Sequence, residues 1–250
     1  MIISIHSYRG GTGKSNITAN LAVLLAAEGL RVGVVDTDIQ SPGIHVLFNF
    51  DDSVIVHSLN DYLWGRCEIR EAACDVTERL EQPIRGRLFL IPSSIKAGEI
   101  ARVLREGYDV SLLNDGFRDL IAALNLDTLL IDTHPGLNEE TLLSIAISDT
   151  LLIILRPDQQ DYLGTSVTVE VACQLNVPRM LMIVNKVPAA FDSTEVKSRV
   201  EETYKCPVAG VLHHSDEMMA LGSAGIFALR YPDHPVSIAM RHVVEIMVKQ

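Results

Sequence analysis

A glycine-rich segment near the start of the chain carries the residue types that bind a polyphosphate. Residues 7–16 read SYRGGTGKSN and follow an apolar run, Ile2–His6, that has the composition of a strand. Glycines let successive backbone N–H groups point into the loop, and the N-terminus of a following helix adds its positive dipole. Lys14 would reach the β- and γ-phosphates, and the Ser15 hydroxyl would ligate Mg²⁺. The segment predicts a phosphate-binding loop made of Gly10, Gly11, Thr12, Gly13, Lys14, Ser15 and Asn16.

Two residues of this loop depart from the common pattern G-x-x-x-x-G-K-[ST]. Tyr8 stands where that pattern has its first glycine, and Arg9 follows it. Arginine keeps a positive charge and adds a planar fork of donors that suits phosphate oxygens. Arg9 therefore either has a phosphate-directed role of its own or is a solvated loop residue.

Aspartates end two other apolar runs. Asp36 ends the run Arg31–Asp36, and Asp38 follows two residues later. The two side chains point the same way if the chain stays extended. We expect this pair beside the phosphate loop; the alternative is an acidic turn that caps the next segment. Asp132 ends Thr128–Asp132 and suits an outer-shell position on Mg²⁺.

The segment after Asp132 reads Thr-His-Pro-Gly. Gly136 would provide a backbone N–H that is free to approach a γ-phosphate. His134 is either a sensor of the γ-phosphate or of a partner subunit, or an ordinary loop residue.

Asn185 follows the apolar run Met180–Val184. An amide carries both a donor and an acceptor, and it can therefore pair with the N6/N7 edge of adenine. A guanine-selecting N-K-x-D sequence would have aspartate where this chain has Pro188. This difference favours ATP over GTP.

Short β-branched runs alternate with helical patterns along the whole chain. The alternation predicts βαβ units and an α/β fold: a doubly wound, mostly parallel sheet with helices on both faces, in three Rossmann-like layers. Right-handed crossovers would place the carboxyl ends of the strands on one rim, where ligands bind. We expect strands at Ile2–His6, Arg31–Asp36, Arg87–Pro92, Thr128–Asp132, Thr150–Leu155, Met180–Asn185 and Val208–Leu212, and helices at Ser15–Glu28, Glu139–Ala146, Tyr162–Leu175, Ser193–Tyr204 and Val236–Val248.

The composition fits one large domain. The 250 residues are 48% hydrophobic and contain no linker-like tract, so we expect a single P-loop domain over residues 1–250. The least regular stretch, Gln40–Arg85, is expected to hold one or two helices and to cover a site or meet a partner. No apolar run reaches the roughly 18–20 residues of a membrane span, and no signal peptide is evident, which predicts a cytoplasmic protein. A net charge of −11 argues against a wholly basic nucleic-acid-binding surface.

Residues 9–15, R-G-G-T-G-K-S, resemble the deviant Walker A motif K-G-G-x-G-K-[ST] of the MinD/ParA family of P-loop ATPases, within the SIMIBI class. That family does not need the first Walker glycine, so Tyr8 is expected. Arg9 falls at the signature lysine, which in the family reaches across a nucleotide-sandwich dimer to the partner's phosphates. The resemblance implies ATP or ADP and Mg²⁺ as cofactors and a homodimer that forms on ATP.

The same resemblance implies roles for the other motif residues. Asp36 would hold a water on Mg²⁺, and Asp38 would orient or deprotonate the attacking water. The family usually has D-x-P-x-G where this chain has D-T-H-P-G, so His134 is a departure. The implied catalytic residues are Arg9, Lys14 and Asp38; the metal-site residues are Ser15, Asp36 and Asp132; and the nucleotide contacts are the phosphate loop, Gly136, Asn185, and the backbone of Val211 and His213, which would pass near the adenine.

Members of this family differ in what they contact. The last residues, 242–250, lack the basic amphipathic character of a membrane-binding tail, so direct membrane binding is not expected. Nonspecific DNA binding is left open by Lys197, Arg199, Lys205, Arg230 and Arg241. The iron–sulfur carriers of the family need a C-terminal C-x-x-C, which is absent here. The resemblance also implies an activating or cargo-adaptor protein as a partner.

Two functions remain. The first is a weakly hydrolysing, Mg²⁺-dependent ATPase that acts as a dimeric switch and positions or partitions a cargo. The second is a hydrolysis-deficient adaptor that dimerises on ATP.

Overall fold

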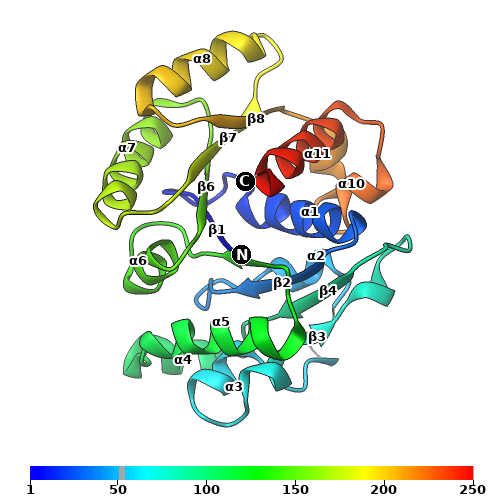
Figure 1. Cartoon of the computed structure of the whole chain (residues 1–250), viewed down its shortest axis with the longest axis vertical. Helices are drawn as coiled ribbons and strands as arrows, with labels where there is room; N and C mark the ends of the chain where they lie inside the picture. The colour runs from blue at the N-terminus through cyan, green and yellow to red at the C-terminus, as the bar shows by residue number, and fades with distance from the viewer. Residues whose placement is uncertain (51–53, 250) are drawn as a thin grey trace.

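An eight-stranded sheet runs through the molecule in the order β3-β4-β2-β5-β1-β6-β7-β8 (Figure 1). The computed structural model describes residues 1–50 and 54–249. Neighbouring strands pair in parallel except β3 and β4, which are antiparallel. The strands are β1 (Ile2–His6), β2 (Arg31–Asp36), β3 (Cys74–Asp75), β4 (Arg87–Ile91), β5 (Thr128–Asp132), β6 (Thr150–Leu155), β7 (Met180–Val187) and β8 (Val208–His213).

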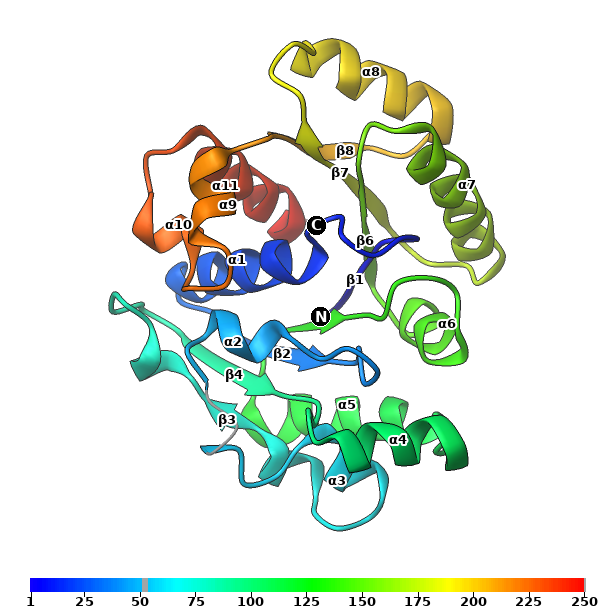
Figure 2. The ribbon, with the colours of Figure 1, turned by 180° about the vertical axis from the view of Figure 1, so that it is seen from behind.

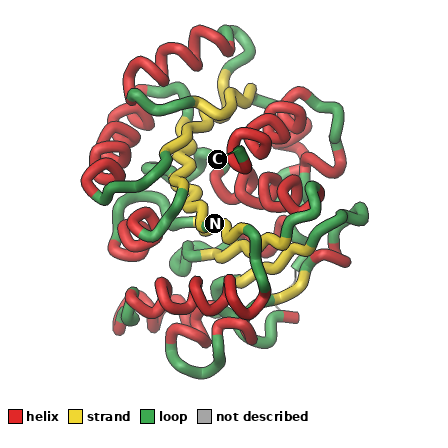
Figure 3. Tube along the Cα trace, viewed as in Figure 1, coloured by secondary structure: helices red, strands yellow, loops and turns green. Residues whose placement is uncertain are grey.

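Helices cover both faces of the sheet (Figures 2 and 3). α1, α10 and α11 share a core with one face, whereas α3, α5, α7 and α8 supply residues to the two cores on the other. The helices are α1 (Lys14–Ala27), α2 (Ile44–Leu47), α3 (Leu59–Leu63), α4 (Ala97–Glu106), α5 (Ser111–Leu124), α6 (Glu139–Ala146), α7 (Gln159–Gln174), α8 (Ser193–Tyr204), α9 (Asp216–Leu221), α10 (Phe227–Arg230) and α11 (Pro235–Val248), with short 3₁₀ turns η2 (Ile69–Ala72) and η3 (Thr77–Arg79).

The apolar runs behave as the sequence predicted. Every residue of β5 and β6 is buried, because helices cover the sheet on both sides. All seven expected strands are present, and the doubly wound, mostly parallel fold is confirmed. The two-residue strand β3, inside the irregular stretch Gln40–Arg85, was not expected.

Strand β7 is longer than predicted, which changes the place of one candidate residue. The predicted strand ended at Asn185, whereas the observed strand continues for two more residues to Val187, so Asn185 lies in its interior. The cause is an irregular pairing with β8, in which the register shifts between Val184 and Val187. The side chain of Asn185 nevertheless points toward the loop that follows β1.

The strand order brings the motifs together. β2, β5 and β1 are neighbours at the centre of the sheet, and Asp132 is in register with both Asp36 and Ile5. The loops that follow these three strands therefore leave the same edge. Among the described helices, none has the length and apolar character required to cross a bilayer.

Candidate functional site

The predicted phosphate loop encloses a cavity of about 230 Å³ at the carboxyl edge of the sheet. A larger groove, of about 860 Å³, lies between α7 and α8 and contains none of the phosphate-loop residues. The smaller cavity is the one that the candidate residues share, and we therefore take it as the site. Its lining comprises Ser7, Gly10, Gly11, Thr12, Gly13, Lys14, Ser15, Asn16, Asp38 and Pro135.

The loop has the backbone shape that an anion requires. Gly11 and Gly13 have φ values of 79° and 92°, in the left-handed region that side chains rarely adopt. Gly13 is also the N-cap of α1, which has no side-chain cap and no acidic residue in its first turn. The first N–H groups of this helix and its positive dipole end are therefore left for a ligand such as a phosphate.

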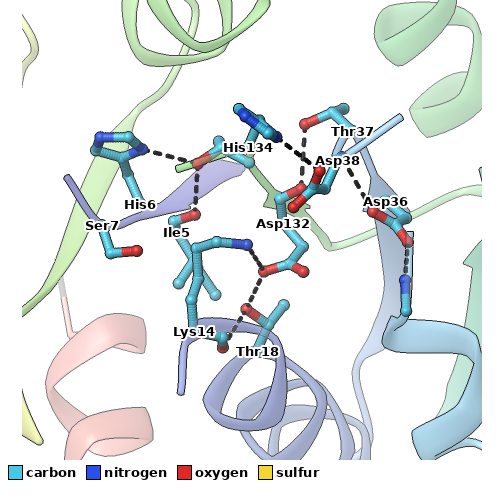
Figure 4. A network of polar contacts seen from close by, with 12 residues as sticks. Ile5, His6, Ser7, Lys14, Thr18, Asp36, Thr37, Asp38, Asp132 and His134 are labelled. Atoms are coloured by element: carbon cyan, nitrogen blue, oxygen red, sulfur yellow. Dashed lines mark hydrogen bonds and ion pairs between the residues drawn. The ribbon is translucent and has the colours of Figure 1, made fainter. Parts of the chain in front are cut away.

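Lys14 is buried on the floor of the site and paired with a buried carboxylate (Figure 4). Its Nζ donates to Asp132 Oδ1 at 2.8 Å, and the Thr18 hydroxyl lies 2.9 Å from the same oxygen. The lysine is thus held beneath the loop by this ion pair. In this structure it neutralises the aspartate that we expect on the outer shell of Mg²⁺.

Asp36 faces this ion pair from the end of β2. Burial and the negative charge of Asp132 raise the pKa of Asp36 to about 8. Its two oxygens accept hydrogen bonds from the backbone N–H groups of Asp38 (3.0 Å) and Gly43 (3.2 Å). The chain therefore turns after Asp36, so the condition under which Asp36 and Asp38 would point the same way, an extended chain, is not met.

The donor set fits Mg²⁺. Hydroxyl and carboxylate oxygens, here those of Ser15, Asp36 and Asp132, are the hard ligands that this ion takes together with phosphate oxygens and water. A divalent cation would also reduce the electrostatic repulsion between the two buried carboxylates of Asp36 and Asp132. No cluster of three or more His, Cys, Asp or Glu side chains that could hold a metal lies among residues 1–50 and 54–249.

Asp38 contacts the loop that follows β5. Its Oδ1 lies 2.6 Å from Nδ1 of His134, and both side chains are partly buried (Figure 4). The sequence left His134 between a sensor and an ordinary loop residue. In the structure it is a direct partner of the predicted catalytic carboxylate.

The backbone of Gly136 is engaged in this structure. Its N–H donates to the carbonyl oxygen of Ser7 at 3.3 Å, with the glycine at φ 89°. The expectation of a free N–H at Gly136 is therefore not met here. A γ-phosphate would have to replace the carbonyl of Ser7 as the acceptor.

The end of β7 supports the phosphate loop from the side. Asn185 Nδ2 donates to the carbonyl of Thr12 at 2.7 Å, and Lys186 Nζ donates to the carbonyl of Gly11 at 2.8 Å. A Cβ on Gly13 would lie 2.7 Å from Asn185 Nδ2, so only glycine fits beside this amide. Lys186 was not among the residues predicted from the sequence, although the Asn-Lys dipeptide was a signal for it.

The remaining nucleotide candidates lie around this edge. Val211 and His213 lie in the adjoining strand β8 and pair with Val184 and Val187 of β7. His213 Nε2 lies 2.7 Å from the Ser193 hydroxyl. Asn16 lines the cavity and donates from Nδ2 to the carbonyl of Gly222 at 3.3 Å. Their roles toward a nucleotide remain predictions.

Arg9 lies on the outer side of the loop, against α7. Its Nη1 is 3.8 Å from Asp158 Oδ1 and 3.6 Å from Asp161 Oδ1. Arg156 binds the same Asp161 through Nε (3.0 Å) and Nη2 (3.3 Å). Asp158 and Asp161 were not among the residues predicted from the sequence; the run R-P-D-Q-Q-D at residues 156–161 was the available signal.

Tyr8 also rests on α7. A Cβ on Gly164 would lie 2.0 Å from the Tyr8 ring, so the absence of a side chain at Gly164 is what lets the ring lie there. The residue that replaces the first Walker glycine thus anchors the outer half of the loop.

The sequence matches the AAA_31 family of AAA domains over residues 1–176. It is 28% identical to an uncharacterized ATP-binding protein of Methanocaldococcus jannaschii, over 96% of this chain and 85% of that protein. It is 29% identical to the flagellum site-determining protein YlxH of Helicobacter pylori, over 85% of this chain and 67% of that protein.

The fold is similar to that of a solved MinD. The septum site-determining protein MinD of Pyrococcus horikoshii, solved in complex with Mg-ADP, superposes with a TM-score of 0.81 and 22% identity. The superposition covers 99% of this chain and 96% of that one. At this level of identity the likeness establishes the shared fold.

Proposed function

Since this chain belongs to the AAA_31 family of P-loop domains and is a MinD/ParA-type protein, we propose that it binds and slowly hydrolyses ATP with Mg²⁺. The observation that carries the proposal is that Lys14 and Asp38 line one glycine-rich cavity, while the buried carboxylates of Asp132 and Asp36 lie behind it, Asp132 paired with Lys14 and Asp36 within electrostatic reach of both. These residues come from the loop after β1 and from the ends of β2 and β5. A structural role alone does not account for three carboxylates around one lysine at this edge.

The proposed chemistry assigns each residue a task. The backbone N–H groups of residues 10–15 would hold phosphate oxygens, and Lys14 would exchange part of its contact with Asp132 for the β- and γ-phosphates. Mg²⁺, when bound, would neutralise charge that develops on the phosphates. Asp38 would orient or deprotonate the attacking water.

Nucleotide binding also reorganises charge on the floor of the site. Asp36 has to be ionised to face Mg²⁺, and its raised pKa shows that this ionisation is costly without a cation. Mg²⁺ and nucleotide binding should therefore stabilise the fold and each other's binding.

We further propose an ATP-sandwich homodimer in which Arg9 acts across the interface. Arg9 is 39% exposed and its distances to Asp158 and Asp161 exceed those of a close hydrogen bond, so it can be transferred to a stronger acceptor. A partner's phosphate oxygens match its donor fork. Lys186 and Asn185 would meanwhile keep the loop carbonyls turned away from the phosphates.

The cellular role that fits is positioning or partitioning of a cargo through an adaptor protein. It rests on the family and on the likeness to a flagellum site-determining protein. Nonspecific DNA is the second surface to test, because Lys197 and Arg199 lie on α8 and Lys205 at its end, although Lys197 lies 3.9 Å from Glu201.

Phosphate release from ATP, measured with Mg²⁺ or with EDTA and with or without duplex DNA, tests the proposal. We expect slow release that requires Mg²⁺, and its loss in Asp38→Ala while ATP still drives dimerisation. Arg9→Ala should bind ATP but remain a monomer when a non-hydrolysable ATP analogue is added, as measured by light scattering. Arg105→Ala, which alters an exposed arginine of α4, is the control and should dimerise as the parent protein does.

The same assay decides between the two functions. Tight ATP binding and dimerisation without phosphate release under every condition would replace the ATPase with the nucleotide-dependent adaptor. Failure to bind ATP would refute both.

A further inference from the structure

The contact between His134 and Asp38 joins two loops that are 96 residues apart in the sequence. Asp38 follows β2, and His134 follows β5, so the loops that leave these two strands meet through these side chains (Figure 4). A carboxylate can only accept hydrogen bonds, so Nδ1 of His134 donates to Asp38 Oδ1. At 2.6 Å this is a short hydrogen bond.

The two oxygens of Asp38 have different surroundings. Oδ1 accepts from His134 Nδ1 and also from the backbone N–H of Ser41 at 3.1 Å. Throughout residues 1–50 and 54–249, no group donates a hydrogen bond to Oδ2. Because Asp38 lines the phosphate-loop cavity, Oδ2 is the oxygen available to a water there.

His134 is itself held in place. Its carbonyl oxygen accepts from the hydroxyl of Thr141, a buried residue in the first turn of α6. On either side of it, Thr133 donates from its backbone N–H to Ile5, and Gly136 donates to Ser7. The backbone that carries His134 is thus tied to β1 and to Ser7, the residue that follows this strand and begins the phosphate-loop segment.

We infer that His134 is a positioning residue: it binds Oδ1 of Asp38 and thereby directs Oδ2 toward the attacking water. The inference rests on the proposed ATPase function. His134 acts through Asp38 and does not need to touch the nucleotide. A misplacement of about 1 Å in such a group can lower a rate by about 10²-fold.

The test compares His134→Ala with His134→Asn, because the amide nitrogen of asparagine can stand close to the position of Nδ1 and donate to Asp38. We expect kcat for ATP to fall by roughly 10- to 100-fold in His134→Ala, with KM and ATP affinity changed less than about 2-fold. His134→Asn should recover most of the loss. His242→Ala, which alters an exposed histidine on α11, is the matched control and should leave kcat unchanged.

Two further readouts separate positioning from a general structural effect. His134→Ala added to Asp38→Ala should cause no further loss, because residues that act as a unit are not additive. In ¹⁵N-labelled nucleotide-free protein, the Nδ1–H signal of His134 should appear downfield and move in Asp38→Ala.

The outcomes are distinguishable from failure of the proposed function. A parent protein that binds ATP but releases no phosphate refutes the ATPase, and with it any role of this pair in turnover. An active parent protein with an equally active His134→Ala variant, or with Ala and Asn variants that lose activity equally, overturns the inference alone. An Nδ1–H signal that is unaffected by Asp38→Ala would overturn it as well.

Discussion

The inner and outer ends of the phosphate loop hold their basic residues in opposite ways. At the inner end the side chain of Lys14 is 7% exposed and lies 2.8 Å from a carboxylate that is almost fully buried. At the outer end the side chain of Arg9 is 39% exposed and lies 3.6–3.8 Å from Asp161 and Asp158. Both are cations beside aspartates, yet only the first is enclosed.

This difference separates the part of the site that folding completes from the part that a partner completes. A buried ion pair cannot be opened cheaply, because removing one member leaves an uncompensated charge in the interior. An exposed and loose pair contributes little and exchanges readily with another ligand. The inner end is therefore a preformed cradle, and the outer end is a contact that a second subunit can take over.

The largest expected effect is at the inner end. Lys14→Met leaves Asp132 buried beside Asp36 without its cation, so we expect a loss of about 3–5 kcal/mol in the free energy of unfolding, together with loss of ATP binding. Urea unfolding of the nucleotide-free protein measures the first and a fluorescent ATP analogue the second.

The double variant Lys14→Met/Asp132→Asn provides the control for this effect. Because it removes both charges, it should recover a large part of the stability but none of the ATP binding. Arg9→Met should cost less than about 1 kcal/mol. A similar loss in the Lys14 and Arg9 variants would contradict the distinction between the two ends.

A second effect is a loss of stability at low pH that comes from His6, a buried histidine near Lys14. Burial, helped by the charge of Lys14, lowers the pKa of His6 to about 3 from an ordinary value of 6.5. Between these values the unfolded chain binds a proton that the folded chain does not, so stability falls as pH drops below 6.5. For this group alone the loss amounts to about 2 kcal/mol between pH 6.5 and pH 5.

Urea unfolding at both pH values, in the parent protein and in His6→Asn, measures that contribution. Asparagine keeps a donor near Nδ1 for Thr133 but does not titrate. The variant should be less stable at neutral pH yet show a shallower loss toward pH 5. An equal slope in the two proteins would show that His6 does not carry this dependence.

The smallest expected effect is at the outer end. Asp158→Asn keeps an N-cap for α7, because asparagine also accepts hydrogen bonds from the backbone N–H groups of Gln160 and Asp161. The substitution removes one of the two negative charges that lie beside Arg9. If the pair restrains Arg9 in the monomer, dimerisation on a non-hydrolysable ATP analogue should become tighter by at most about 5-fold.

Analytical ultracentrifugation measures this shift, with Asp192→Asn as the matched change at the N-cap of α8. Weaker dimerisation in Asp158→Asn would instead indicate that the aspartate itself lies in the interface.

The strands and the fold class could be predicted from local patterns, whereas the helices α4, α5 and α10 were not among the predicted elements. The buried runs of β5 and β6 and the seven long strands follow from apolar content and from the alternation with helices. The two-residue strand β3 was not predicted, because so short a segment has no recognisable pattern and is a strand only through its pairing with β4. The candidate residues of the phosphate loop could be named for a similar reason, since residues 10–16 are contiguous and their chemistry is local.

By itself, then, the sequence determined the parallel α/β fold, the glycine-rich loop and the aspartates that face it. Tertiary structure alone decided the partners: Lys14 with Asp132, His134 with Asp38, and Arg9 with Asp161. Each of these contacts joins segments at or beyond the carboxyl ends of separate strands, and which segments meet depends on strand order and register across the sheet. Local patterns encode where a strand lies in the chain, whereas its neighbours are chosen by the packing of the whole core.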